Sequence, residues 1–92
     1  MTTKARTRRP TSPGEVLREE FMLPLEMTQR QLAQKAGYEV KAINRLINDH
    51  TRVTAEMALA LADVFGTTAR FWINLQIEVD LFDAQQARRA VG

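Results

Sequence analysis

The stretch that decides the fold is Gln29-Arg30-Gln31-Leu32-Ala33-Gln34-Lys35-Ala36-Gly37, followed further along the chain by Ile43 and Leu46. Two short helices that cross at a steep angle need a small residue where their backbones touch. They also need a residue that tolerates positive φ in the turn, and apolar side chains on the second helix. Ala33, Gly37 and the pair Ile43 and Leu46 meet these needs at suitable separations. The stretch therefore predicts two short helices joined by a tight turn.

The sequence on both sides of this stretch predicts further helices, because no window alternates apolar and polar residues for long. Ser12 with Glu15, and Thr28 with Gln31, have the spacing of capping boxes at helix N-termini. The chain is therefore expected to be all-α, with a basic arm over residues 1–11 and one domain over residues 12–88. Five helices are expected, with their caps, over residues 12–24, 28–37, 40–48, 54–66 and 69–88.

Composition limits the chemistry that the chain can perform. The 92 residues include no cysteine and one histidine, His50, so neither a thiolate zinc site nor a cluster of imidazole ligands can form. With a single serine, Ser12, a hydroxyl nucleophile beside an imidazole base has almost no candidates. Acid–base catalysis by carboxylates is the remaining alternative, but these lie at spacings typical of solvated helix faces. We expect a protein that is not an enzyme and that needs no metal or cofactor.

Charge is distributed unevenly although the formal net charge is only +2. Residues 29–52 carry five basic and two acidic side chains, whereas residues 53–87 carry one basic and five acidic ones. A basic middle between acidic flanks is expected if one face meets phosphates. The longest apolar stretch, residues 57–65, is far too short to span a membrane, and the basic N-terminus lacks an apolar signal core. We therefore expect no membrane partner and a cytoplasmic protein associated with the nucleoid.

Residues 29–48 resemble the helix-turn-helix of the lambda-repressor-like family of bacterial DNA-binding proteins. The resemblance implies a five-helix lambda-repressor-like domain. In that geometry the second helix of the motif lies in the major groove, and residues near its N-terminus meet the edges of the bases. The partner expected from this resemblance is operator DNA.

Five residues on the outward side of this second helix are candidates for reading bases. Lys41 and Arg45 are four residues apart and can donate to guanine O6 and N7. Asn44 can read adenine, and Val40 can contact a thymine methyl group. Glu39 can accept from cytosine N4 or hold a neighbouring basic side chain. The alternative for each of them is a solvated helix face.

Three further residues are candidates for contacts with the DNA backbone. Gln29 lies at a helix N-terminus, where the helix dipole also favours an anion. Thr51 and Arg52 lie in the loop after the second helix and are expected to bind phosphates. His50, in the same loop, is expected to be exposed.

Three more segments, residues 12–21, 53–59 and 66–76, resemble the HigA (VapI-type) antitoxins, and this resemblance covers residues 11–83. It implies a homodimer that represses its own operon by binding a palindromic operator. It also implies that the protein neutralises a HigB toxin, an RNA-cleaving enzyme of the RelE superfamily.

Two residues depart from the family pattern. Glu39 stands where the family commonly has Ser or Thr as the helix cap, and Asp49 stands where it commonly has Gly. Asp49 must therefore accept the positive φ that glycine adopts without strain. These departures are also consistent with a second function, that of a protein-interaction module that no longer reads DNA. A stand-alone transcriptional regulator without a toxin partner is a further alternative.

The helix expected over residues 69–88 has too many apolar residues for a single stripe. One row contains Trp72 and Val79, and a second row lies about 100° round the helix. We expect one row to serve the core and the other to contact a second copy of the chain. For Trp72 a core position is the favoured interpretation and a contact with a second copy or with a toxin is the alternative, and the whole helix could also be buried within its own domain. The candidate dimer residues are Trp72, Ile73, Ile77 and Leu81.

Overall fold

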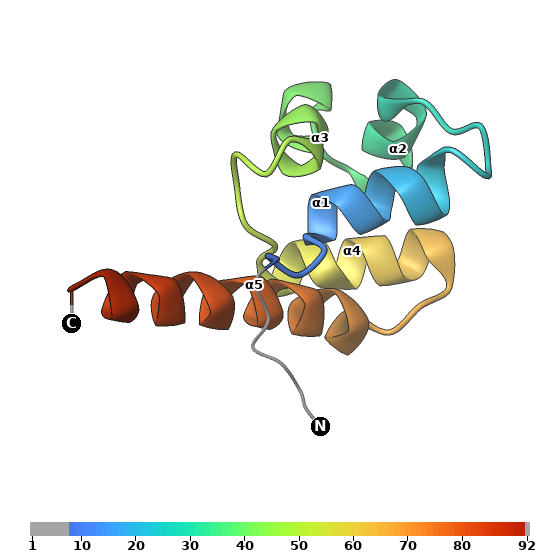
Figure 1. The fold of residues 1–92 in the computed structure, drawn as a ribbon. Helices are drawn as coiled ribbons and strands as arrows, with labels where there is room; N and C mark the ends of the chain where they lie inside the picture. The colour runs from blue at the N-terminus through green and yellow to red at the C-terminus, as the bar shows by residue number, and fades with distance from the viewer. Residues whose placement is uncertain (1–7, 92) are drawn as a thin grey trace.

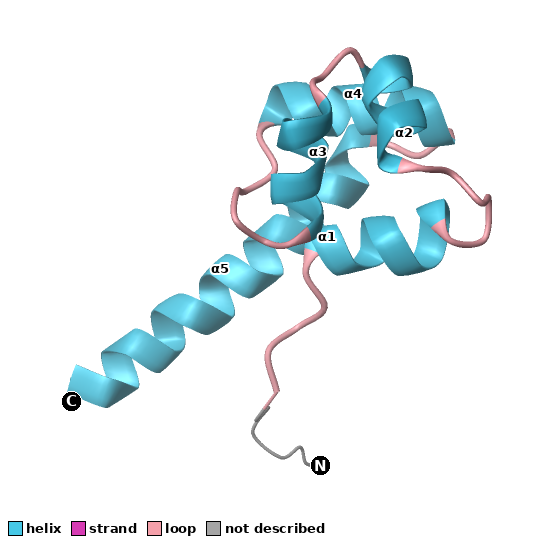
Figure 2. Cartoon of the chain, turned by 90° about the horizontal axis from the view of Figure 1, so that it is seen from above, coloured by secondary structure: helices cyan, strands magenta, loops and turns pink. Residues whose placement is uncertain are grey.

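The computed structural model describes residues 8–91, so most of the basic arm expected over residues 1–11 lies outside the described part of the chain. Within residues 8–91 the regular structure is entirely helical, which confirms the all-α prediction (Figures 1 and 2). None of the helices in this range is both long and apolar enough to cross a membrane. The elements are α1 (Pro13–Val16), η1 (Leu17–Met22), α2 (Gln29–Ala36), α3 (Val40–Ile47), α4 (Ala55–Phe65) and α5 (Ala69–Val91).

The first helix differs from the expectation of a single α-helix, because α1 continues into the π-helical segment η1. Ser12 caps α1 as predicted, its Oγ accepting a hydrogen bond of 3.1 Å from the backbone N–H of Glu15. At the far end the Leu23 N–H donates to the Arg18 carbonyl at 2.9 Å, five residues back rather than four. The helix ends before Pro24, which has no N–H to continue it.

The two-helix stretch folds as its sequence predicts. Thr28 and Gln31 form the capping box at the start of α2, through bonds of 2.8 and 3.0 Å in opposite directions. Gly37 ends α2 with φ +77°, which L side chains rarely adopt. Ala33 on α2 is 3% exposed, and Ile43 on α3 is fully buried. The positions of α2 and α3 are therefore fixed by local sequence signals.

The core is built around Trp72, which has no exposed surface. Its ring lies 5.2 Å from that of Phe21 and 5.0 Å from that of Phe71, and its Nε1–H donates a 2.8 Å hydrogen bond to Thr67 Oγ1. This position corrects the assignment of Trp72 to a dimer interface, because a side chain buried by its own domain has no surface to offer a second copy. The core position is the interpretation that the structure confirms.

Helix α5 packs against the domain mainly through its N-terminal half. Gln76 is 7% exposed and Val79 2%, whereas every residue from Asp83 to Ala90 is exposed. The C-terminal half consequently projects from the domain, as both views of the chain show (Figures 1 and 2). This projecting half is available to a partner.

Candidate DNA-binding surface

Helix α3 divides cleanly into a buried side and an exposed side. Ile43, Leu46 and Ile47 face the core, and Ile47, the most accessible of them, is 8% exposed. The other side exposes four of the five predicted base-reading residues, which therefore share one accessible surface. They are Val40, Lys41, Asn44 and Arg45.

The structure brings Gln29 and Asn44 together although they lie on different helices. The Asn44 Nδ2 donates a 3.3 Å hydrogen bond to Gln29 Oε1, between the N-terminus of α2 and the middle of α3. Gln29 was expected to meet a phosphate and Asn44 a base. The residue predicted to bind a phosphate therefore lies next to a residue predicted to read a base, at the edge of α3.

Arg45 is partly occupied by the loop that follows its own helix. One of its Nη atoms donates to the His50 carbonyl at 3.0 Å, and the His50 N–H donates to the Arg45 carbonyl at 2.8 Å. His50 is exposed, as expected. The loop is thereby folded back on α3, and the exposed Arg45 guanidinium is held near the end of the helix.

Glu39 caps α3 without help from its side chain. Its backbone is extended, with φ −78° and ψ 153°, and its carbonyl accepts from the N–H groups of Ala42 and Ile43. Its carboxylate makes no side-chain hydrogen bond to the helix N-terminus, which agrees with glutamate being a weak cap. Among residues 8–91 it forms no ion pair with Lys41, so a contact with cytosine stays a prediction.

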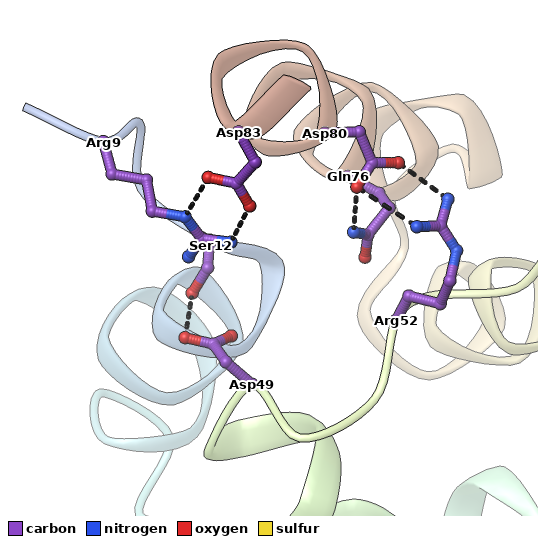
Figure 3. A network of polar contacts seen from close by, with 7 residues as sticks. All are labelled: Arg9, Ser12, Asp49, Arg52, Gln76, Asp80 and Asp83. Atoms are coloured by element: carbon purple, nitrogen blue, oxygen red, sulfur yellow. Dashed lines mark hydrogen bonds and ion pairs between the residues drawn. The ribbon is translucent and has the colours of Figure 1, made fainter. Parts of the chain in front are cut away.

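Asp49 ends α3 in the left-handed conformation that its position demands, with φ +61°. Its Oδ2 accepts a 2.9 Å hydrogen bond from the Oγ of Ser12, which is 4% exposed (Figure 3). Ser12 therefore caps α1 and anchors the end of α3 with the same hydroxyl group. The spacing of Ser12 and Glu15 indicated the cap, but the residues around Asp49 gave no signal of this long-range bond.

Arg52 points toward α5 rather than lying free beside α3 (Figure 3). Its two Nη atoms donate to both carboxylate oxygens of Asp80, at 3.1 and 2.7 Å. This pairing holds the pKa of Asp80 below its usual value and raises that of Arg52. The contact between Arg52 and a phosphate stays a prediction. In the structure the Arg52 guanidinium is already bound to Asp80. Thr51, beside it, is exposed.

A second arginine is bound to α5 in the same way. Arg9 Nε and Nη2 donate to the two carboxylate oxygens of Asp83, at 3.0 and 2.8 Å (Figure 3). Its hydrogen bonds to Arg9 are the main cause that lowers the pKa of Asp83. Sequence reasoning missed both of these ion pairs, because the partners lie far apart along the chain.

Three of the candidate dimer residues remain accessible to different degrees. Ile77 is 44% exposed and Leu81 53%, and Leu81 lines a shallow groove on the projecting half of α5 together with Phe82. Ile73 is partly buried and packs against the domain core. The row that runs through Ile77 and Leu81 therefore has an apolar surface that its own domain leaves uncovered.

Comparison with known proteins identifies the class to which this fold and surface belong. The family model described as Helix-turn-helix matches residues 17–72. An HTH-type transcriptional regulator of Haemophilus influenzae is 45% identical over 83 residues, which cover 90% of this chain and 78% of the relative. The chain therefore belongs to the helix-turn-helix family.

Within this family the similarity extends to antitoxins. Antitoxin HigA-1 of Vibrio cholerae is 41% identical over 78 residues, which cover 85% of this chain and 73% of the relative. The solved structure of Pseudomonas aeruginosa antitoxin HigA with the higBA promoter superposes with a TM-score of 0.84 at 34% identity, covering 89% of each chain. These similarities confirm the resemblance to HigA-type antitoxins.

Proposed function

We propose that this chain is a DNA-binding repressor that acts as the antitoxin of a type II toxin–antitoxin module. The observation that carries the proposal is the single exposed face of α3, on which Lys41, Asn44 and Arg45 stand together. These side chains supply donors for guanine and paired donor and acceptor groups for adenine. The P. aeruginosa relative whose structure was solved with its promoter supports this use of the fold.

Contacts with the DNA backbone would flank this reading face. Gln29 lies at the N-terminus of α2, where backbone N–H groups favour an anion, and Thr51 is exposed in the loop after α3. Val40 is 42% exposed at the start of α3 and offers an apolar contact for a thymine methyl group. Glu39, beside it, would accept from a cytosine amino group.

Operator binding as a dimer requires a surface that pairs two domains, and α5 offers one. Ile77 and Leu81 are the exposed apolar residues of the row, with Leu81 at the start of the projecting half and Ile73 at the edge of the core. Isologous pairing through this row would create a two-fold axis. On a palindromic operator the two copies of α3 would then enter successive major grooves about 34–36 Å apart.

The direct test of DNA binding is a mobility shift with the DNA upstream of the protein's own gene. We expect a shift that persists at moderate salt in the presence of competing random-sequence duplex. Salt weakens the contacts with phosphates, whereas the contacts with bases are specific to the upstream sequence. The absence of any shift at low salt would refute DNA binding and favour a protein-interaction module.

The proposed toxin partner is a HigB-like RNase of the RelE superfamily. The similarity to antitoxin HigA-1 supports this partner. Co-expression of a neighbouring toxin gene with this chain should relieve growth arrest and yield a complex that co-purifies. If upstream DNA is bound but no neighbouring product is neutralised, the chain is instead a stand-alone regulator, as the similarity to the H. influenzae transcriptional regulator would then favour.

A further inference from the structure

Two arginines lie beside the proposed DNA-binding surface, and aspartates of α5 bind both of them. Arg52 follows α3 and pairs with Asp80 through two hydrogen bonds, and Arg9 pairs with Asp83 in the same manner (Figure 3). This two-point arrangement is also the geometry in which a guanidinium binds a phosphate. Each aspartate thus occupies donors that a DNA phosphate would use.

Asp80 is held in position from its own helix. The buried Gln76 donates from Nε2 to Asp80 Oδ1 at 3.0 Å, and its Oε1 accepts from the Val53 N–H at 2.8 Å. Because the amide of Gln76 is fixed at both ends, the carboxylate is presented to Arg52 in a defined orientation. The pairing of Arg52 with Asp80 is therefore organised by the core rather than by two mobile side chains alone.

The charges around these pairs do not favour a phosphate. Arg9 and Arg52 are accompanied by three carboxylates, those of Asp49, Asp80 and Asp83 (Figure 3). The group consequently carries a net charge of −1 when all five side chains are ionised. Positive charge available to DNA is concentrated instead on α3, at Lys41 and Arg45.

We propose that Asp80 and Asp83 determine specificity by competing with DNA phosphates for Arg52 and Arg9. Contacts with phosphates strengthen binding to every sequence alike and carry no sequence information. Withholding two arginines weakens attachment to a loosely docked, non-operator duplex, while the base contacts of α3 still hold the protein on its operator. This inference rests on the DNA-binding function proposed above.

The test compares Asp80→Asn with Glu78→Gln. Both variants remove one negative charge from α5, but Glu78 is exposed and has no ion-pair partner among residues 8–91. Affinity for a random-sequence duplex and for the upstream DNA would be measured over a series of KCl concentrations. We expect Asp80→Asn to bind random duplex more tightly, with the salt slope steeper by about 0.9 for each additional phosphate that the protein neutralises. The increase in affinity should be smaller on upstream DNA, and Glu78→Gln should leave the slope unchanged.

Adding Arg52→Ala to Asp80→Asn should abolish the increase, because Arg52 is the group that Asp80 withholds. Asp83→Asn provides a second variant at a more exposed aspartate, and it should act through Arg9 in the same direction. Unchanged slopes in both aspartate variants, or weaker binding in both, would overturn the proposal while leaving DNA binding intact. If the unmodified protein binds neither duplex at low salt, the DNA-binding function itself fails and this inference fails with it.

Discussion

Gly14, in the first turn of α1, lies directly against the carbonyl oxygen of Leu46 near the end of α3. A Cβ atom at position 14 would overlap that oxygen and would lie 2.8 Å from the carbonyl oxygen of Ile47. The absence of a side chain at Gly14 therefore lets α1 approach the backbone of the helix proposed to read DNA. Together with the bond from Ser12 to Asp49, this contact fixes the C-terminal end of α3.

Gly14→Ala should destabilise the protein by about 1–3 kcal/mol, because backbone carbonyl groups cannot move aside as a flexible side chain would. Urea unfolding measures the loss. Glu20→Ala, at an exposed position of η1, is the control and should stay within about 0.5 kcal/mol of the unmodified protein. If Gly14→Ala and the control are equally stable, α1 can move away from α3 without a loss of unfolding free energy, and the close approach at Gly14 is not required for stability.

Arg45→Ala should weaken binding to upstream DNA by ~1–3 kcal/mol and relax the preference at one base pair. The reason is that its exposed guanidinium has donors left after its bond to the His50 carbonyl. Binding to a panel of single-base variants of the upstream site measures the effect. Arg70→Ala removes the same charge from the exposed surface of α5 and serves as the control. A uniform loss over the whole panel would assign Arg45 to the phosphates instead.

Thr67→Val should cost about 1–3 kcal/mol, since it leaves the buried indole N–H of Trp72 without its acceptor. Thermal unfolding of a double-mutant cycle with Trp72→Phe isolates this bond. In the Phe background the cost of Thr67→Val should fall, because phenylalanine has no N–H to satisfy. The same cost in both backgrounds would mean that the threonine acts through packing alone.

Leu81→Lys should convert the proposed dimer into a monomer, because a charge would be placed in an apolar pairing surface. Analytical ultracentrifugation distinguishes the two states. Leu59→Lys makes the same change on α4, where leucine is 60% exposed but outside the proposed interface, and it should leave the dimer intact. A dimer that tolerates Leu81→Lys together with Ile77→Lys would place the interface elsewhere.

Stability should depend on the ionisation of Asp80 in acid. Arg52 lowers the pKa of Asp80 in the folded state. The pairing therefore stabilises the fold at pH values above the ordinary pKa of an aspartate, and this stabilisation is lost as the pH falls through the lowered pKa. The difference in unfolding free energy between the unmodified protein and Asp80→Asn should therefore shrink as the pH falls from 7 toward 2. High salt at neutral pH should also reduce it, since the pair is exposed. A difference independent of pH would assign the effect to hydrogen bonding.

Features encoded by neighbouring residues could be predicted from the sequence. The caps at Ser12 and Thr28 and the turn at Gly37 depend on side chains and backbone within a few residues, and all three are present, although only Thr28 and Gln31 form both bonds of a capping box. The positive φ of Asp49 was likewise expected from the demand of its position. The buried and exposed sides of α3 follow from helical spacing.

Features that join distant parts of the chain could not be predicted in this way. The pairs of Arg9 with Asp83 and Ser12 with Asp49 span 74 and 37 positions, so no local pattern encodes them. Trp72 shows a related limit, because the periodicity of α5 identifies its apolar rows but not whether the same chain or a second copy covers them. Only the packing of Phe21 and Phe71 around the indole decides that question.

In the proposed dimer, the projecting half of α5 would link association to helix formation. Residues 84–90 are all exposed, and isolated helices shorter than about 12–15 residues are only marginally stable in water. In a separate chain these last turns would fray, whereas a second copy lying along them would order the backbone as it binds. Dilution of the proposed dimer would then lower helical content as well as separate the subunits, so part of the free energy of association would be spent on ordering the turns that follow Leu81.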